Sequence, residues 1–264
     1  MSERPGASTT VDGILYRPTY AFVPPDSFFE AGPVGAEEPL FNVLDFGAVA
    51  DPGIDNRPMI QAAIDAAHAA GGGMVYIPPG TYGVAGAPDD TGGIYVLSNV
   101  FLKGAGMGES ILRVVDGWDG TLTGIVRTPF AEATTNYGVA DLTLDGNRDN
   151  TSGKVDGYFS GGLPGGTIAD EDAYILRVEA ENNSGYGFDP HEQTIRLSLS
   201  DSVAHHNGLD GFEADFVIDS VYSGNLAHHN DRHGFNIVTS TVKPPFYVPF
   251  PDRVSGTGVR MFRT

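Results

Sequence analysis

The chain has 264 residues, of which only 19% are charged, with 36 glycines, 18 prolines and no cysteine. This length and texture favour one elongated, β-rich domain, and the missing cysteines exclude disulfides and thiolate metal sites. The formal net charge of −19 excludes nucleic acids and anionic membranes as partners, because both are recognised by basic surfaces. It also opposes a polyanionic substrate unless calcium or a local basic lining offsets the repulsion.

Residues 1–40 are rich in proline, serine, glycine and acidic side chains and show no apolar periodicity, so we expect a loosely ordered N-terminal arm. The first residues, MSERPGASTTVDG, lack the basic and apolar segments of a signal peptide. No apolar run in the chain is long enough to cross a bilayer, and we expect no membrane association.

A strand and an amphipathic helix are predicted next. The stretch FNVLDFGAVAD, from Phe41, is typical of a strand followed by a turn, and three helix-start residues come after it: Asp55, Asn56 and Pro58. Apolar residues then recur at helical spacing, at Ile60, Ala63, Ile64 and Ala67. Three glycines at 71–73 end the helix. We expect this helix to cap the open end of a stack of strands.

Short alternating runs with sharp corners fill most of the remaining chain, among them MVYIPPGTY, VADLTLDG, AYILRVEAEN and TIRLSLSDSVAHHN. They predict strands. An irregular polar stretch at 147–166 interrupts them, and long loops of this kind are often functional. The rhythm ends near Val242, where a proline-rich tail, residues 242–264, begins.

Nine residues at 180–188 (AENNSGYGF) return at 204–212 (AHHNGLDGF) and at 227–235 (AHHNDRHGF), so the period is 24 and then 23 residues. A period in the low twenties with asparagine and glycine corners is typical of a solenoid, whose coils stack at strand spacing. If the phenylalanine that ends each repeat points inward, the residues one and three places after it form two outward columns, Asp189–Glu213–Asn236 and His191–Asp215–Val238. The residue two places before it gives a third column, Tyr186–Asp210–His233. One outer face thus gathers more titratable groups than a scaffold needs.

Two sets of motifs carry a family resemblance. NVLDFGAVAD and IQAAIDAAHAAGGGMVYIPPGTY resemble the N-terminal cap of pectate-lyase-like proteins. DLTLDGNRDNTSGKVDG, SGYGFDPHEQT, DSVAHHNGLDGFEADF and NDRHGFNIVTST resemble the catalytic module of the secreted, calcium-dependent mannuronan C-5-epimerases. The resemblance covers residues 41–241 and implies an all-β fold, a right-handed parallel β-helix with an N-terminal capping α-helix. Family modules continue for several more coils, so we expect an incomplete module followed by a tail unrelated to the family.

The same resemblance assigns roles. It implies four catalytic residues, Tyr186, Asp189, His191 and Asp215. Four further residues are expected to bind substrate, Lys154, Arg232 and His233 by the family motifs and Asp210 because it shares the column of Tyr186. The implied substrate is alginate or polymannuronate, the implied cofactor is Ca²⁺, and the implied location is extracellular.

Epimerisation removes a weakly acidic proton at C5 of a uronate and returns one to the opposite face, so the site needs a base, an acid and charge compensation. His191 and Tyr186 suit the first two roles in either order, the tyrosine if a nearby cation lowers its pKa. Asp189 and Asp215 lie in neighbouring coils, where one can keep its proton and hydrogen-bond the substrate carboxylate. Positive charge would come from Arg232 and Lys154.

Other interpretations stay open. Alginate lyase action uses the same base and ends in elimination, and a catalytically silent carbohydrate-binding homologue would also keep the fold. Asp189 and His191 alone would also suit a polar ladder of the scaffold. Four repeated histidines are expected to be solvated corner residues rather than metal ligands: His205, His206, His228 and His229. An oxygen-rich cluster could bind calcium or form turns, and we assign no metal ligands to it: Asp145, Asn147, Asp149 and Asn150.

Overall fold

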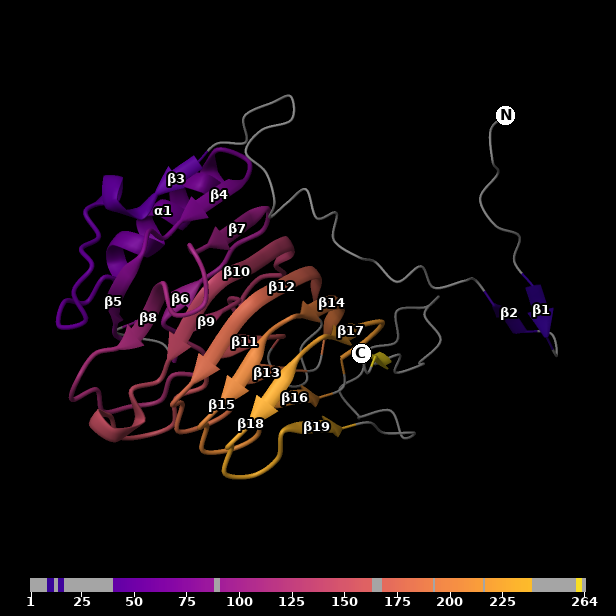
Figure 1. Cartoon of the computed structure of the whole chain (residues 1–264). Helices are drawn as coiled ribbons and strands as arrows, with labels where there is room; N and C mark the ends of the chain where they lie inside the picture. Colours follow the sequence, from indigo (N-terminus) through magenta and orange to yellow (C-terminus); the bar gives the residue numbers. More distant parts are fainter. Residues whose placement is uncertain are drawn as a thin grey trace.

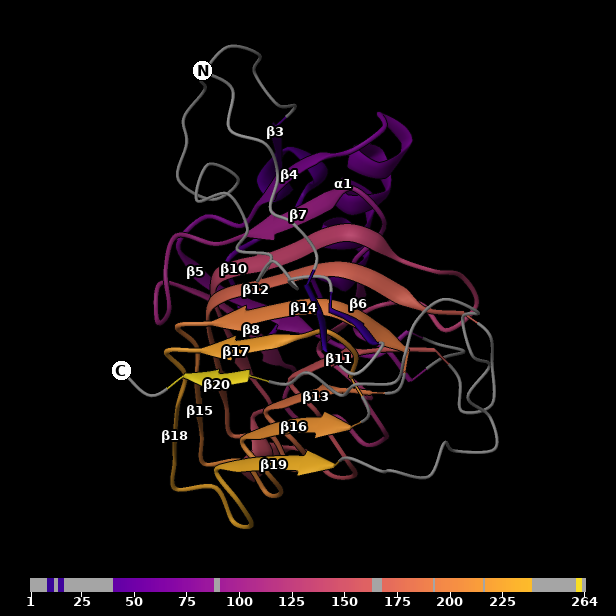
Figure 2. The same cartoon turned by 90° about the vertical axis from the view of Figure 1, so that its right-hand side faces the viewer.

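The computed structural model describes residues 40–87, 91–162, 168–191, 193–215 and 217–238, and the backbone of 9–11, 14–16 and 260–262. Within these ranges the chain winds through successive coils of parallel strands, so the fold is the predicted parallel β-helix (Figure 1). The coils lie one below another from β4 to β17 in the turned view of Figure 2. The predicted boundaries at 40 and 242 fall beside segments that lie largely outside the described residues, where only a short antiparallel pair, β1 (Thr9–Val11) with β2 (Ile14–Tyr16), precedes residue 40.

One wall of the β-helix is a six-stranded parallel sheet that will carry the candidate site. Its strands are, in spatial order, β6 (Ile94–Tyr95), β9 (Val126–Arg127), β11 (Tyr158–Ser160), β13 (Phe188–Pro190), β16 (Phe212–Asp215) and β19 (Phe235–Val238). Each strand belongs to the coil after that of its neighbour, so residues far apart in sequence meet in fixed columns.

The other walls form one continuous sheet. Its main path is β3 (Leu40–Asn42), β4 (Gly73–Tyr76), β7 (Val100–Lys103), β10 (Thr135–Asp145), β12 (Asp170–Glu181), β14 (Thr194–Ser200), β17 (Val221–Ser223) and β20 (Arg260–Phe262). Off this path, β5 (Gly80–Val84) pairs with β8 (Ser110–Val114), and β15 (Val203–His205) pairs with β18 (Leu226–His228).

The strands β10 and β12 are long because each passes a corner and continues on the next wall. The first half of β10 pairs with β7 and its end pairs with β8. At the corners Asp141 and Arg177 adopt left-handed φ angles of 57° and 51°. The guanidinium of Arg177 donates two hydrogen bonds to the Asp141 carboxylate, at 2.5 and 3.0 Å, so the two corners are tied together.

The helix prediction is confirmed. Helix α1 (Arg57–Ala69) lies at the N-terminal end of the stack (Figure 1), against β3, β4, β6 and β7, and its four predicted apolar residues are buried. Asn56 does not cap it through its side chain. Instead Asn56 Oδ1 accepts a hydrogen bond from Val49 N at 2.7 Å, and Asn56 Nδ2 donates one to Ile54 O at 2.9 Å. The side chain thus holds the loop that follows the 3-10 turn η2 (Val43–Phe46). No helix in the described ranges is long and apolar enough to cross a membrane.

Stacked aromatic rings confirm the predicted inward column. The rings of Phe188 and Phe212 lie 4.8 Å apart and within 1° of parallel, and Phe235 continues the stack at the same spacing. Phe188 and Phe212 are buried. Because alternate residues of a strand point to opposite faces, the residues one and three places after each phenylalanine must face outward.

A ladder of asparagines fixes the corner before this wall. Asn207 accepts hydrogen bonds from the backbone and side-chain nitrogens of Asn183, at 3.1 and 2.8 Å, and makes the same two bonds to Asn230, at 3.1 and 2.9 Å. Its amide also donates to Ala180 O at 3.0 Å. Asn183 and Asn207 are fully buried, so every rung depends on its neighbours for partners.

We expect the substitution Asn207→Ala to lower the free energy of unfolding by about 2–3 kcal/mol, because the backbone and side-chain N–H groups of buried Asn183 and the carbonyl of Ala180 lose the hydrogen bonds that the Asn207 side chain gives them. Urea denaturation would measure the change. The matched control is Asn230→Ala at the half-buried end of the ladder, which should cost clearly less; equal losses in the two variants would show that the ladder is not the source of the stability.

Candidate active site

The predicted outward columns lie side by side on the six-stranded wall. In the register of β16 and β19, Glu213 is opposite Asn236 and Asp215 is opposite Val238, and Phe188 is opposite Phe212 one coil earlier. On the preceding coil, β11 places Phe159 opposite Asp189. The geometry thus brings together, on one wall, side chains that lie tens of residues apart in the sequence.

Asp189 is the most deeply buried of the four expected catalytic residues. It is 3% exposed, and its Oδ1 has no hydrogen-bond partner among the described residues. Burial, and then the nearby carboxylate of Asp156, raise the pKa of Asp189 to about 7. Asp215 contributes in the same direction but ranks below Asp156, so the expected pairing of Asp189 with Asp215 is only part of the cause. Near neutral pH a large fraction of the molecules, about half at pH 7, therefore keeps a proton on Asp189 that it can donate.

His191 lies between carboxylates. Its Nε2 is 3.3 Å from Asp215 Oδ2 and 4.0 Å from Asp189 Oδ1. The imidazole also stacks on Phe159, with ring centres 5.6 Å apart and planes 25° from parallel, and its backbone nitrogen donates to Ser160 O at 2.8 Å. An imidazole held in this way has a fixed orientation and a carboxylate ready to stabilise its protonated form.

Tyr186 lies between two cations. Lys154 Nζ is 4.7 Å from the centre of its ring, and the Arg232 guanidinium carbon is 5.4 Å from it. Arg232 Nη2 also donates to the phenol oxygen at 3.2 Å. The cations foreseen from the sequence are present, but burial outweighs them and raises the pKa of Tyr186 above its ordinary value. The phenol is therefore protonated at neutral pH, contrary to the expected lowering.

Asp156 was missed by the sequence reasoning. Its carboxylate is fully buried, Oδ2 lies 2.8 Å from Lys154 Nζ, and Oδ1 accepts from the backbone nitrogen of Tyr186 at 2.8 Å. Burial raises the pKa of Asp156. Burial alone would lower the pKa of Lys154, but Asp156 outweighs it and raises that pKa. The loop that carries Lys154 is thus anchored directly beneath Tyr186 and Asp189.

Asp210 organises the lower part of the wall. It accepts from Arg232 Nε at 2.7 Å, from Arg232 Nη2, and from the backbone nitrogen of His233 at 2.9 Å. Burial would raise its pKa, but Arg232 lowers it well below the ordinary value. Burial and a hydrogen bond to Asp210 raise the pKa of the adjacent Glu213 to about 8, and Asn236 donates to Glu213 Oε2 at 2.8 Å.

Of the eight residues singled out in the sequence, Asp189 and Asp215 lie on strands of this wall and the other six lie in the connections beside those strands. Their partners differ from those expected in two places. Arg232 and Lys154 were expected to offer free positive charge to substrate, yet each is engaged with a carboxylate and with Tyr186. His233 is the most exposed of the set, and its Nδ1 lies 2.9 Å from Asp210 Oδ1. Three residues of the site had no role assigned from the sequence. Glu213 lay in a predicted column, whereas Phe159 and Asp156 lie in a coil whose sequence shows no repeat.

Fold and side chains together define a parallel β-helix protein with a cluster of ionisable side chains along one outer wall. The chain belongs to the family described as rhamnogalacturonase A/epimerase, pectate lyase-like, which it matches over residues 40–243. The expected fold class and family resemblance are confirmed.

Comparison with individual relatives shows which members of this family the chain is similar to. The chain is 60% identical over 202 residues to mannuronan C5-epimerase AlgE4 of Azotobacter vinelandii, covering 76% of this chain and 36% of that protein. It is 54% identical over 202 residues to alginate lyase 7 of the same species, covering 76% of this chain and 24% of that protein. It resembles the solved AlgE4 A-module of Azotobacter vinelandii with a TM-score of 0.75 and 58% identity, over 78% of this chain and 55% of that module. The chain thus spans little more than half of the solved module and 36% or less of these two full-length relatives.

We expect Asp189→Asn to stabilise the protein at pH 8 but not at pH 4. Between the ordinary pKa of 3.8 and the folded value of about 7, the folded state holds a proton that the unfolded chain has lost, so wild-type stability falls as pH rises through this window. The pKa difference corresponds to about 4 kcal/mol as an upper limit. Urea denaturation at both pH values would test this, with exposed Asp65→Asn on α1 as the control. A variant that is no more stable than wild type at pH 8 would show that Asp189 ionises at its ordinary pKa.

Proposed function

We propose that this wall is a mannuronan C-5-epimerase site, which converts β-D-mannuronate to α-L-guluronate in polymeric alginate. The observation that carries the proposal is the convergence of Tyr186, Asp189, His191 and Asp215 within one hydrogen-bonded wall. The 60% identity to a protein named as a mannuronan C5-epimerase supports it. Because the chain spans only part of that protein, the activity is a proposal for this chain.

Neutralising the substrate carboxylate is the first requirement, since it makes the C5 proton removable. Asp189, with a pKa of about 7, can donate its proton in a hydrogen bond to a uronate carboxylate. Burial keeps this acid neutral, and the same burial strengthens its hydrogen bond to a bound anion. No free cation at the carboxylate is then needed.

The raised pKa of Tyr186 favours one direction of proton transfer. His191 takes the C5 proton, and Asp215, whose Oδ2 lies 3.3 Å from His191 Nε2, stabilises the imidazolium that forms. Tyr186 begins as a neutral phenol and gives its proton to the opposite face of the ring. The phenolate that remains is stabilised by the hydrogen bond from Arg232 and by Lys154 over the ring. Exchange with water then restores both groups, so protons balance over the cycle.

Alginate lyase action is the second candidate, and the 54% identity to a protein named alginate lyase 7 favours it. The first step is the same abstraction at C5. The C4–O bond then breaks and leaves an unsaturated sugar, and Tyr186 protonates the departing oxygen instead of C5. Because both reactions use the same groups, the product distinguishes them.

Calcium and secretion are expectations from the family resemblance and belong to the proposal. The oxygen-rich turn at 145–150 does not fit a calcium cage, because the side-chain oxygens of Asp145 and Asn147 already have protein partners. Asp145 Oδ1 accepts from Asn147 N at 2.8 Å, and Asn147 Oδ1 accepts from Arg113 at 2.6 Å and from Asn150 at 2.8 Å. Arg113 also lies 3.4 Å from Asp145 Oδ2. A calcium ion needs six to eight free oxygens, so no step of the reaction is assigned to it here.

Proton NMR of polymannuronate incubated with the purified chain tests the proposal. We expect the guluronate anomeric signal to grow without unsaturated chain ends. His191→Ala and Tyr186→Phe should each lower turnover by about 10²–10⁴-fold with the fold retained by circular dichroism, because each removes a proton-transfer group. His229→Asn, an exposed histidine on another corner, is the control. Unsaturated ends would assign lyase action, and a folded chain that binds polymannuronate without product would be the silent homologue.

Arg232→Lys separates two roles for this cation. If Arg232 acts through Tyr186, the loss of a charge-assisted hydrogen bond of about 1.5–3 kcal/mol should lower kcat by about 10–100-fold and leave KM nearly unchanged. Steady-state kinetics on polymannuronate would measure both constants. A rise in KM at constant kcat would instead mean that Arg232 binds the substrate carboxylate directly, as the sequence motifs suggest.

A further inference from the structure

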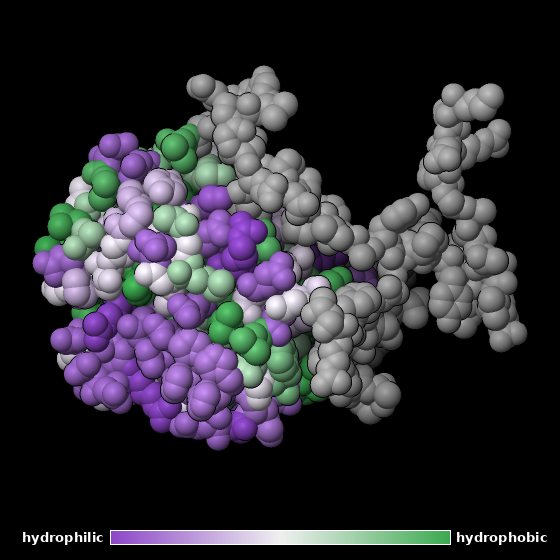
Figure 3. Space-filling model, in the orientation of Figure 1, coloured by the Kyte–Doolittle hydropathy of each residue, from purple (hydrophilic) through white to green (hydrophobic). Residues whose placement is uncertain are grey.

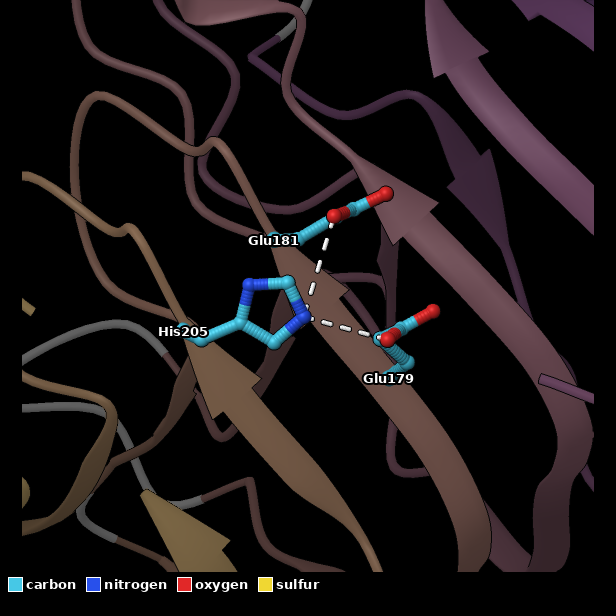
Figure 4. Close-up of side chains that lie close together, drawn as sticks. All are labelled: Glu179, Glu181 and His205. Carbon is cyan, nitrogen blue, oxygen red and sulfur yellow. Dashed lines mark hydrogen bonds and ion pairs between the residues drawn. The ribbon is translucent and has the colours of Figure 1, made fainter. Parts of the chain in front are cut away.

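A second cluster of ligating side chains lies away from the six-stranded wall. Glu179 and Glu181 stand two residues apart near the end of β12, and His205 ends β15 directly beside them, in register with Glu181. Their side chains point toward one another (Figure 4). This part of the surface is strongly hydrophilic where β12, β15 and β18 end, at the lower left of Figure 3.

The distances match a small metal ion. His205 Nε2 lies 3.1 Å from Glu179 Oε1 and 3.7 Å from Glu181 Oε2, and one ligand atom from each residue lies within 4.8 Å of the others. Zinc bonds nitrogen and carboxylate oxygen at about 2.0–2.2 Å, which puts neighbouring ligand atoms of a tetrahedron about 3.3–3.6 Å apart. The strand register holds the three side chains at this spacing without an ion.

Partners behind the ligands fix their orientation. Thr143 Oγ1 donates to Glu179 Oε2 at 2.7 Å, which leaves Oε1 directed at His205. His205 Nδ1 lies 2.8 Å from His206 Nδ1, so one of these two nitrogens carries the shared proton. When His205 carries it, the lone pair of its Nε2 faces two carboxylates, and either a proton or a metal ion between them makes this arrangement favourable. Ligating histidines in metal sites are oriented in this way through their second ring nitrogen.

The donor set decides which ion fits. One imidazole and two carboxylates suit a borderline transition ion such as Zn²⁺ and fall well short of the six to eight oxygens that calcium takes. All three side chains are partly exposed, so an ion can enter and a water can complete its coordination. The histidines were expected to be solvated corner residues; His205 departs from that expectation because β12 presents carboxylates beside it.

We propose that Glu179, Glu181 and His205 form a binding site for one zinc-class divalent ion, which joins two consecutive coils. The proposal does not depend on the function of the six-stranded wall. His228 supplies an internal control, because it stacks on His205 with ring centres 4.8 Å apart and planes 4° from parallel, yet it makes no ion pair with a carboxylate in the described part of the chain.

Isothermal titration of the metal-free full chain with Zn²⁺ tests the site, with Ca²⁺ titrated in parallel. We expect one Zn²⁺ per chain, a higher Tm with Zn²⁺, and no displacement of Zn²⁺ by Ca²⁺. Glu181→Gln and His205→Gln should each weaken binding more than the roughly 10- to 100-fold cost of a lost outer partner, while His228→Gln keeps it. Circular dichroism would confirm that each variant is folded.

Two results would overturn the proposal. The first is the absence of saturable Zn²⁺ binding by the wild-type chain. The second is loss of binding in His228→Gln together with full binding in Glu181→Gln, because this would place the ion on the stacked imidazoles and not on the carboxylates. Visible absorption of the Co²⁺-loaded chain gives a separate check, since a four-coordinate site with mixed nitrogen and oxygen ligands has intense bands that an octahedral ion lacks.

Discussion

The structure depends on one constraint, that each coil sits on the previous coil in register at strand spacing. The stacked rings of Phe188, Phe212 and Phe235 and the ladder of Asn183, Asn207 and Asn230 enforce that register. A slip of one residue would move every inward side chain to the outer face. These phenylalanines and asparagines therefore fix the positions of the outward columns, although they are not part of the candidate site.

The same constraint crowds like charges. Stacking places Asp189 in the column of Glu213 and close to Asp156, at separations where three ionised carboxylates in a buried wall would repel strongly. The structure resolves the conflict in two ways. Asp189 and Glu213 keep their protons to higher pH, whereas Asp210 stays ionised because Arg232 pairs with it. Neighbouring acids with separated pKa values are a common arrangement for proton transfer.

Much of the fold could be predicted because the sequence repeats show which residues of successive coils are in register. The period of the Gly-Phe pairs led to the correct columns, and the spacing of Ile60, Ala63, Ile64 and Ala67 to the correct helix. Asp156 escaped because its coil lacks the repeat, so nothing in the sequence places it below Tyr186. Glu179 and Glu181 escaped for a related reason: β12 crosses a corner without a break, so its last residues meet His205 on a different wall from that of its first. The hydrogen-bond partners of a side chain such as Arg232 depend on distances in the folded structure, and these cannot be derived from sequence spacing.

The distribution of protons also answers a difficulty raised by composition. A chain of net charge −19 should repel a polyuronate, and the cations of the wall are already paired with Asp156 and Asp210. A neutral acid avoids the repulsion, because protonated Asp189 can accept a carboxylate next to it without any gain in positive charge. Ionisation of Asp189 would place a second negative charge at the same point. For the proposed substrate, the proton on Asp189 therefore removes the negative charge that would oppose binding and also supplies the hydrogen bond that makes the C5 proton more acidic.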